Sequence, residues 1–201
     1  LTIQRTGGQA AVDRPDRARI FSWLGVGPSF SNVIGPVAAG LVIDAAGFRA
    51  AYGMLFLLPL ATLLTARAVP HLAPAGPPPD VPGRKTWDLL RAPGLARLLV
   101  VNWLLSTCWD VHTFAVPILG HERGFSASTI GLILGTFTLS VTLIRMLIPL
   151  FAQRLRPVLV LRSAMLGTGL IFALYPLAPN PWLMGVCALT LGVTLGSVQP
   201  M

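Results

Sequence analysis

The sequence predicts an all-α membrane protein, a bundle of helices that crosses a lipid bilayer several times. Of its 201 residues, 54% are apolar or aromatic and 11% are charged, less than half of the roughly 25% charged residues in an ordinary soluble domain. The mean hydropathy is +0.72. The apolar residues form six long blocks separated by charged residues, and a chain of this length offers too little polar surface to enclose six buried helices in water.

Each of the six blocks is predicted to cross the bilayer, because about 20 helical residues span a hydrocarbon core of about 30 Å. The predicted spans are residues 20–43, 50–66, 98–119, 125–151, 158–178 and 181–201. The second extends to residue 69 when the side chain of Arg67 reaches back to the headgroups. Single charged residues interrupt two others, Asp110 in the third span and Arg145 in the fourth.

A proline-rich segment separates the second predicted span from the third. Residues 70–96 include seven prolines, which is typical of an extended linker. Residues 85–91 mix basic, aromatic and leucine side chains, which fits a short helix on the membrane surface or a solvated turn.

The net charge of +8 is read as a topology signal and not as a sign of a nucleic-acid partner. If the N-terminal segment is cytoplasmic, twelve of the fifteen basic residues fall on the cytoplasmic side, Arg49 and Arg123 fall outside, and Arg145 lies in the membrane. We therefore expect a multi-pass protein of the cell (inner or plasma) membrane, with the N-terminal segment and the 70–96 loop in the cytoplasm. One lysine against fourteen arginines is typical of a GC-rich bacterial gene.

Small residues recur at helical spacing within the predicted spans, which favours close helix packing in lipid. Gly27, Ser31, Gly35 and Ala39 recur every fourth residue in the first span. Pairs at the same spacing follow in the fourth, fifth and sixth spans: Gly131 and Gly135, Ser163 and Gly167, Gly192 and Gly196. Pro36 has no N–H to donate to the carbonyl of Asn32, so a kink is predicted there.

These residues carry a resemblance to a known family. The set Ser22, Ser31, Gly35, Pro36, Ala39 and Gly40, followed by Asp44, Gly47, Phe48 and Arg49, resembles the glycine-proline pattern of the fifth transmembrane helix in the major facilitator superfamily. Residues 124–131 are similar to a common family entry into the eighth helix. Arg145 and Arg154 resemble the two ends of a cytoplasmic-loop signature.

The resemblance implies a fragment that corresponds to transmembrane helices 5 to 10 of a 12-helix transporter. Residues 1–19 would be a cytoplasmic loop after a missing helix, and residues 20–69 the last two helices of the N-terminal half. Residues 70–96 would be the cytoplasmic linker, and residues 97–201 the first four helices of the C-terminal half. Gly35, Pro36 and Gly40 would form the structural helix-packing motif.

The main candidate site surrounds Asp110, because an ionised aspartate at bilayer depth costs roughly 2.5–3.5 kcal/mol and is functional by default. At helical spacing Asn102, Ser106 and Thr113 share its face. We expect this face to border a water-filled cavity, with Asp110 coupling proton movement to substrate. The alternative is a hydrogen-bonded aspartate that fastens two helices together.

Three further residues are secondary candidates. His112 lies about 200° around the helix from Asp110 and is expected to contact a neighbouring helix or to reach the outer interface. For Arg145, an ion pair with an acid of the cytoplasmic loop is favoured over binding of an anionic substrate. Gln199 either lines the cavity or hydrogen-bonds between helices.

The predicted function is secondary active transport of a small molecule by alternating access, with proton-driven export of fairly hydrophobic compounds as the first hypothesis. Proton-coupled uptake of a sugar or organic acid and a non-transporting structural remnant are the alternatives. No enzyme is expected, because the sequence lacks the motifs of nucleophilic or metal-dependent catalysis. Cys108, Cys187 and the three histidines lack metal-ligand spacing, so neither a metal nor another cofactor is expected.

Overall fold

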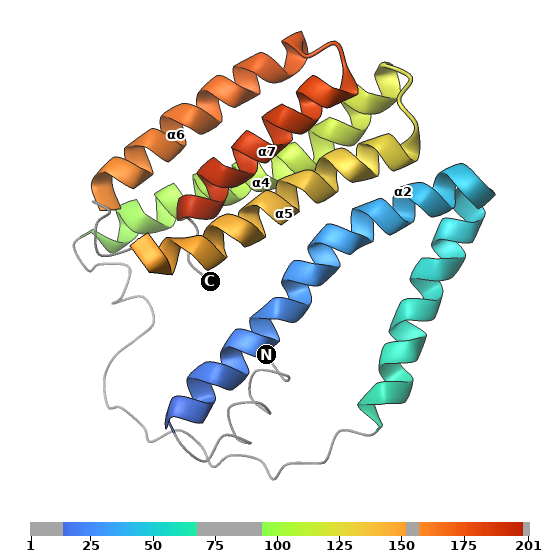
Figure 1. Ribbon diagram of the computed structural model, residues 1–201, viewed down its shortest axis with the longest axis horizontal. Helices are drawn as coiled ribbons and strands as arrows, with labels where there is room; N and C mark the ends of the chain where they lie inside the picture. Colours follow the sequence, from blue (N-terminus) through green and yellow to red (C-terminus); the bar gives the residue numbers. More distant parts are fainter. Residues whose placement is uncertain (1–13, 68–93, 152–156, 199–201) are drawn as a thin grey trace.

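The computed structural model describes residues 14–67, 94–151 and 157–198. In these ranges the chain folds into the helices α2 (Arg14–Ala66), α4 (Leu95–Glu122), α5 (Ala127–Phe151), α6 (Pro157–Leu174) and α7 (Pro181–Val198), with a short 3₁₀ helix, η1 (Tyr175–Leu177), after α6 (Figure 1). This arrangement confirms the predicted all-α fold class. Most of the predicted linker, the proposed surface helix at 85–91 and Gln199 lie outside the described residues.

Helix α2 has two arms that meet at Gly47. Its backbone there has φ 79° and ψ 173°, a conformation that is essentially restricted to glycine. We call residues 14–46 the first arm and residues 48–66 the second arm; they contain the first two predicted spans. Pro36 lies inside the first arm, and the non-helical residue within α2 is Gly47. The break at Gly47 falls between the first two predicted spans, and the kink predicted at Pro36 stays a prediction.

Four helical stretches among the described residues are long and apolar enough to cross a bilayer. They are Gly27–Ala66, Ala127–Leu147, Val158–Leu177 and Pro181–Val198. The first has 40 residues and contains the break at Gly47, so it holds most of the first predicted span and the whole of the second. Helix α4 has 28 residues but is not among the four, because polar residues such as Asn102 and Asp110 interrupt its apolar sequence.

Helix α5 is the central helix of the described structure. It packs against the first arm of α2 on one side and against α7 on the other, while α6 packs on α7 and α4 makes smaller contacts with α5 and α7 (Figure 1). The most deeply buried apolar side chains come from α5 and α7, including Phe137, Met184, Leu191 and Leu195. The core of the fold therefore lies between these two helices.

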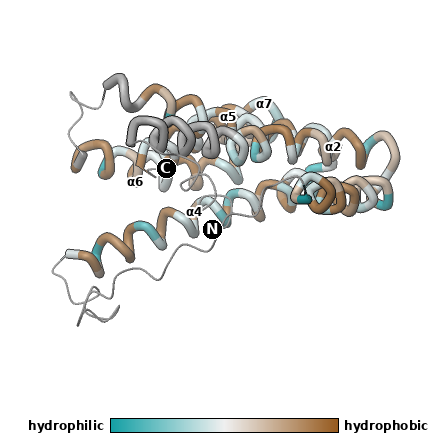
Figure 2. Tube along the Cα trace, turned by 90° about the horizontal axis from the view of Figure 1, so that it is seen from below, coloured by the Kyte–Doolittle hydropathy of each residue, from teal (hydrophilic) through white to brown (hydrophobic). Residues whose placement is uncertain are grey.

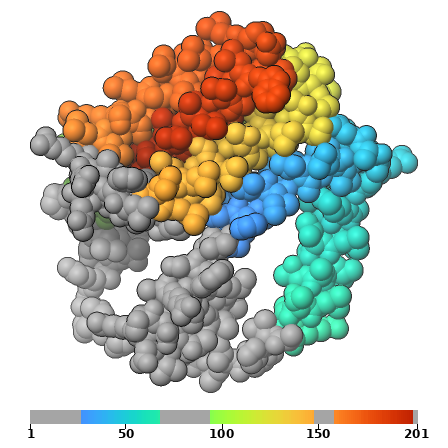
Figure 3. All heavy atoms as spheres, in the orientation of Figure 1, coloured from blue at the N-terminus to red at the C-terminus, as the bar shows by residue number. Residues whose placement is uncertain are grey.

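The outward sides of the helices are apolar. Figure 2 shows hydrophobic residues along the described helices, and many large ones, among them Phe114, Leu166 and Trp182, are exposed. The second arm stands away from the bundle in Figures 1 and 3, and its exposed residues include Tyr52, Phe56 and Leu63. Such extensive apolar exposure fits a lipid environment.

Glycine allows the closest approach between helices. A Cβ atom added to Gly40 of α2 would lie 2.9 Å from the Cα atom of Ser128, and one added to Gly131 of α5 would lie 3.0 Å from the carbonyl carbon of Pro36. Gly192 of α7 approaches α5 equally closely, with 2.5 Å between an added Cβ and the carbonyl oxygen of Phe137. Within the described residues, a Cβ at Gly35 would meet nothing within 4 Å. Of these two glycines of the glycine-proline pattern, Gly40 is therefore the one that lies against α5.

Two charged side chains bind the ends of helices. The Asp44 carboxylate accepts hydrogen bonds from the backbone N–H groups of Ala127 (3.0 Å) and Ser128 (2.8 Å), and so caps the N-terminus of α5 from the first arm of α2. The Arg123 guanidinium, in the turn between α4 and α5, donates to the carbonyl oxygens of Pro176 (2.7 Å) and Ala178. These contacts join segments that are far apart in the sequence.

Candidate functional site

A polar cavity lies where the first arm of α2, helix α4 and helix α5 meet. Its volume is about 260 Å³, and its lining comprises Asn32 from α2, Ser106, Trp109 and Asp110 from α4, and Arg145 from α5. The cavity thus gathers an acid, a base, an amide and a hydroxyl group from three helices that are mostly apolar. Polar groups placed together in this way are typical of a binding or ion path through a membrane protein.

Helical spacing explains the contribution of α4. Ser106 and Asp110 are four residues apart and therefore lie one above the other on the same face. The carboxylate of Asp110 offers only acceptors when ionised, whereas the guanidinium of Arg145 offers only donors. The two are thus complementary in charge and in hydrogen bonding, and a polar solute with both kinds of group has a partner for each in the cavity.

A hydrogen bond between α2 and α5 supports the part of the cavity lining that α2 contributes. Because Pro36 has no N–H, the carbonyl oxygen of Asn32 lacks its usual helical donor. The hydroxyl of Thr138 on α5 donates to that oxygen at 2.9 Å. Hydroxyl groups often satisfy the carbonyl that a proline leaves in a membrane helix. This bond holds the backbone of Asn32 against α5 beside the cavity.

The other two residues of the predicted face do not line the cavity. Asn102 is exposed, one turn before Ser106. Thr113 is also exposed, and its hydroxyl donates to the backbone carbonyl of Asp110 at 2.9 Å. The structure therefore places Ser106 and Asp110 together and leaves Asn102 and Thr113 outside the lining.

Arg145 lines the same cavity as Asp110. The ion pair expected for it with an acid of the cytoplasmic loop stays a prediction. Sequence reasoning missed Asn32 and Trp109 as lining residues. The signal available for Asn32 was its position four residues before Pro36, which marks a carbonyl in need of a donor from another helix.

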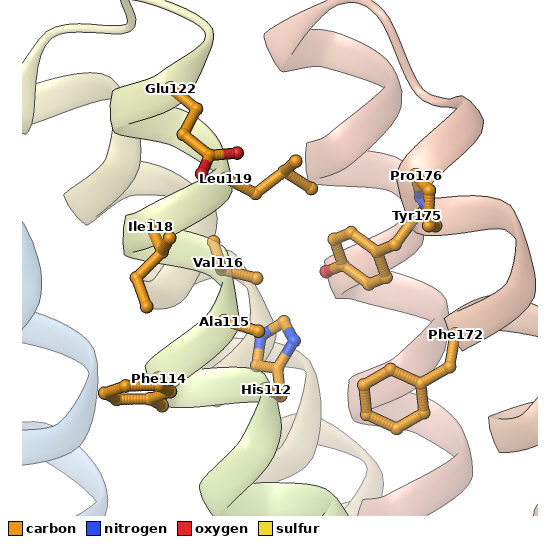
Figure 4. A pocket seen from close by; sticks show the side chains of 10 residues that line it. All are labelled: His112, Phe114, Ala115, Val116, Ile118, Leu119, Glu122, Phe172, Tyr175 and Pro176. Atoms are coloured by element: carbon orange, nitrogen blue, oxygen red, sulfur yellow. The ribbon is translucent and has the colours of Figure 1, made fainter.

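His112 lies on the other side of α4, as its angular separation from Asp110 requires. Its side chain is fully buried, and its ring centroid lies 4.2 Å from that of Phe137 and 5.6 Å from that of Tyr175. It lines a second cavity of about 350 Å³ between α4 and the α6–η1 segment (Figure 4). The two cavities share no lining residue.

A third cavity, of about 420 Å³, lies between α5 and α7. Its walls are mainly apolar and include Leu132, Ile133 and Trp182, with the hydroxyls of Thr129 and Thr136. Thr136 donates to the carbonyl of Leu132 in its own helix. Within the described residues, no cluster of three or more His, Cys, Asp or Glu side chains could hold a metal ion.

The exposed apolar helices and the polar cavity between them define a multi-pass helical membrane protein. Residues 10–201 match the model of the family described as Major Facilitator Superfamily. The chain belongs to this family, which confirms the resemblance noted in the sequence.

Several curated relatives are exporters. The chain is 26% identical over 174 residues to proteins named Enterobactin exporter EntS from Escherichia coli O157:H7 and Shigella boydii serotype 18, covering 85% of this chain and 41% of each relative. The chain therefore spans less than half the length of these relatives. No solved structure matches the chain.

Proposed function

We propose that the chain forms part of a proton-coupled secondary transporter that exports a small, largely apolar organic molecule. The observation that carries this proposal is the cavity lined by Asp110 and Arg145, because it brings opposite charges together among helices that are mainly apolar. It lies between the first arm of α2, assigned by sequence to the N-terminal half, and helices α4 and α5 of the C-terminal half. Family members bind substrate between two such halves near the middle of the membrane.

The chemistry of the cavity supports proton coupling. An ionised Asp110 attracts the guanidinium of Arg145 and favours a closed arrangement of α4 and α5. Binding of a proton removes the negative charge, so this attraction ends and the donors of Arg145 become available to a solute. Release of the proton on the opposite side of the membrane restores the attraction.

The direction of transport and the substrate class rest on separate observations. The printed names of the relatives describe exporters, which supports export by the complete protein. The apolar cavity between α5 and α7 supports a substrate with substantial apolar surface. Membership in a transporter family likewise supports a function without enzymatic catalysis. The charge pattern supports a bacterial inner-membrane location with the 70–96 loop in the cytoplasm.

Uptake of an organic acid is the second candidate function. Arg145 supports it, because a guanidinium beside a polar cavity is suited to bind a carboxylate. Transport of an anion would then depend on Arg145 more strongly than transport of a neutral or cationic compound.

The test uses the complete protein in proteoliposomes with an imposed pH gradient, and enterobactin and ethidium as probe solutes. We expect Asp110→Asn to reduce gradient-driven transport by at least about tenfold while solute exchange without a gradient continues, because only the proton step is removed. Thr107→Val is the matched control on α4, since the Thr107 hydroxyl donates within its own helix, to the carbonyl of Trp103. An unchanged pH dependence in Asp110→Asn contradicts the proton role.

Vesicles of opposite orientation decide the direction of transport. Accumulation in inside-out vesicles corresponds to export from the cell, and accumulation only in right-side-out vesicles supports uptake. Arg145→Gln separates the two substrate classes, because a selective loss of organic-acid transport supports the second candidate.

A further inference from the structure

The cavity beside His112 has features that the proposed transport path does not use. It lies between α4 and the α6–η1 segment (Figure 4), and helical spacing places Asp110 on another side of α4. Its volume of about 350 Å³ is within the usual range of small-molecule sites, roughly 300–1,000 Å³. Phe172, Val116 and Leu119 make its lining mainly apolar.

Two side chains in this cavity bury polar atoms without a partner. The side chain of His112 is 0% exposed and that of Tyr175 is 5% exposed. Among the described residues, neither ring nitrogen of His112 has a hydrogen-bond partner, and the Tyr175 hydroxyl also has none. Leaving such groups unpaired in an apolar setting is costly, so a native protein normally supplies a partner.

The unpaired atoms belong to two neighbouring rings. The ring centroids of His112 and Tyr175 are 5.6 Å apart, and Figure 4 shows both rings directed into the space between α4 and η1. A neutral imidazole has one donor and one acceptor nitrogen, and a phenol hydroxyl is both donor and acceptor. A ligand hydroxyl, which both donates and accepts, is therefore complementary to either group.

We propose that this cavity is a binding site for a small, uncharged aromatic alcohol of the phenol class. The hydroxyl of the ligand hydrogen-bonds to His112 and Tyr175, and its ring packs against these aromatic rings and Phe172. Glu122 completes the lining at the C-terminal end of α4, and its carboxylate disfavours an anionic ligand. The site is separate from the cavity of Asp110, so it is an additional site and not a part of the proposed proton path.

The test measures binding and does not depend on transport. The complete protein in lipid nanodiscs is dialysed to equilibrium against 2-naphthol, 2-methylnaphthalene or 2-naphthoate, with empty nanodiscs subtracted. We expect saturable binding of one 2-naphthol per chain, at least about tenfold tighter than binding of either comparison compound. The methyl compound lacks the hydroxyl, and the carboxylate adds a negative charge near Glu122.

Two variants connect the binding to the proposed residues. Tyr175→Phe removes one oxygen atom, and His112→Phe removes both nitrogens while keeping an aromatic ring. Each is expected to weaken 2-naphthol binding by at least about tenfold and to leave 2-methylnaphthalene binding within about twofold. Thr107→Val is the control. If His112→Phe fails to fold, Tyr175→Phe alone decides the outcome.

Several results overturn the proposal. Equal affinity for 2-naphthol and 2-methylnaphthalene shows that the buried polar atoms do not bind the hydroxyl. Absence of saturable binding shows that a water molecule or another part of the complete protein fills the cavity. A 2-naphthol affinity that is unchanged in Tyr175→Phe places the ligand elsewhere. Loss of transport in Asp110→Asn has no bearing on any of these outcomes.

Discussion

At the scale of single residues, a backbone carbonyl of α2 accepts a hydrogen bond from a side chain of α5. The oxygen of Asn32 has lost its helical donor to Pro36, and the hydroxyl of Thr138 replaces that donor. Thr138 also lies within hydrogen-bond distance of the carbonyls of Leu134 and Gly135 in its own helix. The contact to α2 is therefore the one that depends on helix packing.

This bond predicts an energetic coupling between Thr138 and Pro36. Thr138→Val is expected to reduce the free energy of unfolding by about 1–2 kcal/mol, because the carbonyl of Asn32 loses its partner. Pro36→Ala restores a backbone N–H for that carbonyl, so the same substitution should cost less in the Pro36→Ala background. Reversible unfolding of the complete protein in mixed micelles measures the four proteins of this cycle. Equal costs in both backgrounds contradict the coupling.

The sequence predicted part of the candidate site at this scale. Helical spacing is sufficient to align Ser106 with Asp110, because both lie on one helix. It gives no information about which residues of other helices face them, so Asn32 was missed and Arg145 was not placed beside Asp110. His112 was separated from Asp110 by the same spacing argument, but its contacts with Phe137 and Tyr175 depend on tertiary packing.

At the scale of helices, the first arm of α2 and helix α5 form a closely packed pair. Gly40 and Gly131 remove the side chains that would keep their backbones apart. Asp44 adds two charge-assisted hydrogen bonds at the N-terminus of α5. Sequence alone identified the small residues but could not choose between the faces of Gly35 and Gly40, because both faces carry small side chains.

Gly40 and Gly35 of α2 predict opposite effects of adding one methyl group. Gly40→Ala is expected to destabilise the complete protein by about 1–3 kcal/mol, because the new Cβ meets the backbone of α5, which cannot move away easily. Gly35→Ala is the matched control, and it should be neutral or stabilising by up to about 1 kcal/mol, since alanine favours a helix over glycine. Unfolding in mixed micelles measures both. A larger loss from Gly35→Ala contradicts the packing described here.

The cap on α5 makes a second prediction at this scale. Asp44→Ala leaves the N–H groups of Ala127 and Ser128 without their acceptor, whereas Asp44→Asn keeps one carbonyl oxygen. We expect faster amide hydrogen exchange at Ala127 and Ser128 in both variants, with the larger increase in Asp44→Ala. Exchange rates equal to those of the unmodified protein contradict a capping role.

Arg123 predicts a further local effect at the same end of the bundle. Arg123→Gln removes the guanidinium that donates to the carbonyls of Pro176 and Ala178. Hydrogen exchange in the α6–α7 turn should accelerate by roughly tenfold, corresponding to a loss of about 1.4 kcal/mol. Arg162→Gln is a control, because Arg162 is exposed on α6. Equal acceleration in both variants contradicts a specific contact.

At the scale of the whole molecule, composition was the strongest guide. The long apolar blocks predicted an all-helical membrane fold, and the described helices and the family match agree with it. Composition gives no information on how helices pair, so the central place of α5 and the separate position of the second arm came from the structure. The polar character of α4 was visible in advance as the interruption of its span by Asp110.

The predicted topology is tested by reporters at two positions of the complete protein. Tags inserted at Ala75 and Glu122 should report opposite sides of the membrane, with Ala75 in the cytoplasm, because one predicted span separates them. A third tag beside Arg67 is the control and should agree with Ala75. Tags at Ala75 and Glu122 on the same side contradict the predicted arrangement.

Gly47 has a consequence for everything that follows it along the chain. An uninterrupted α2 of 53 residues would be about 80 Å long at 1.5 Å per residue, far more than the thickness of a hydrocarbon layer of about 30 Å. The reversal at this glycine turns one overlong rod into an outward and a return passage. A single achiral residue thus brings both ends of α2 to the same side of the bundle.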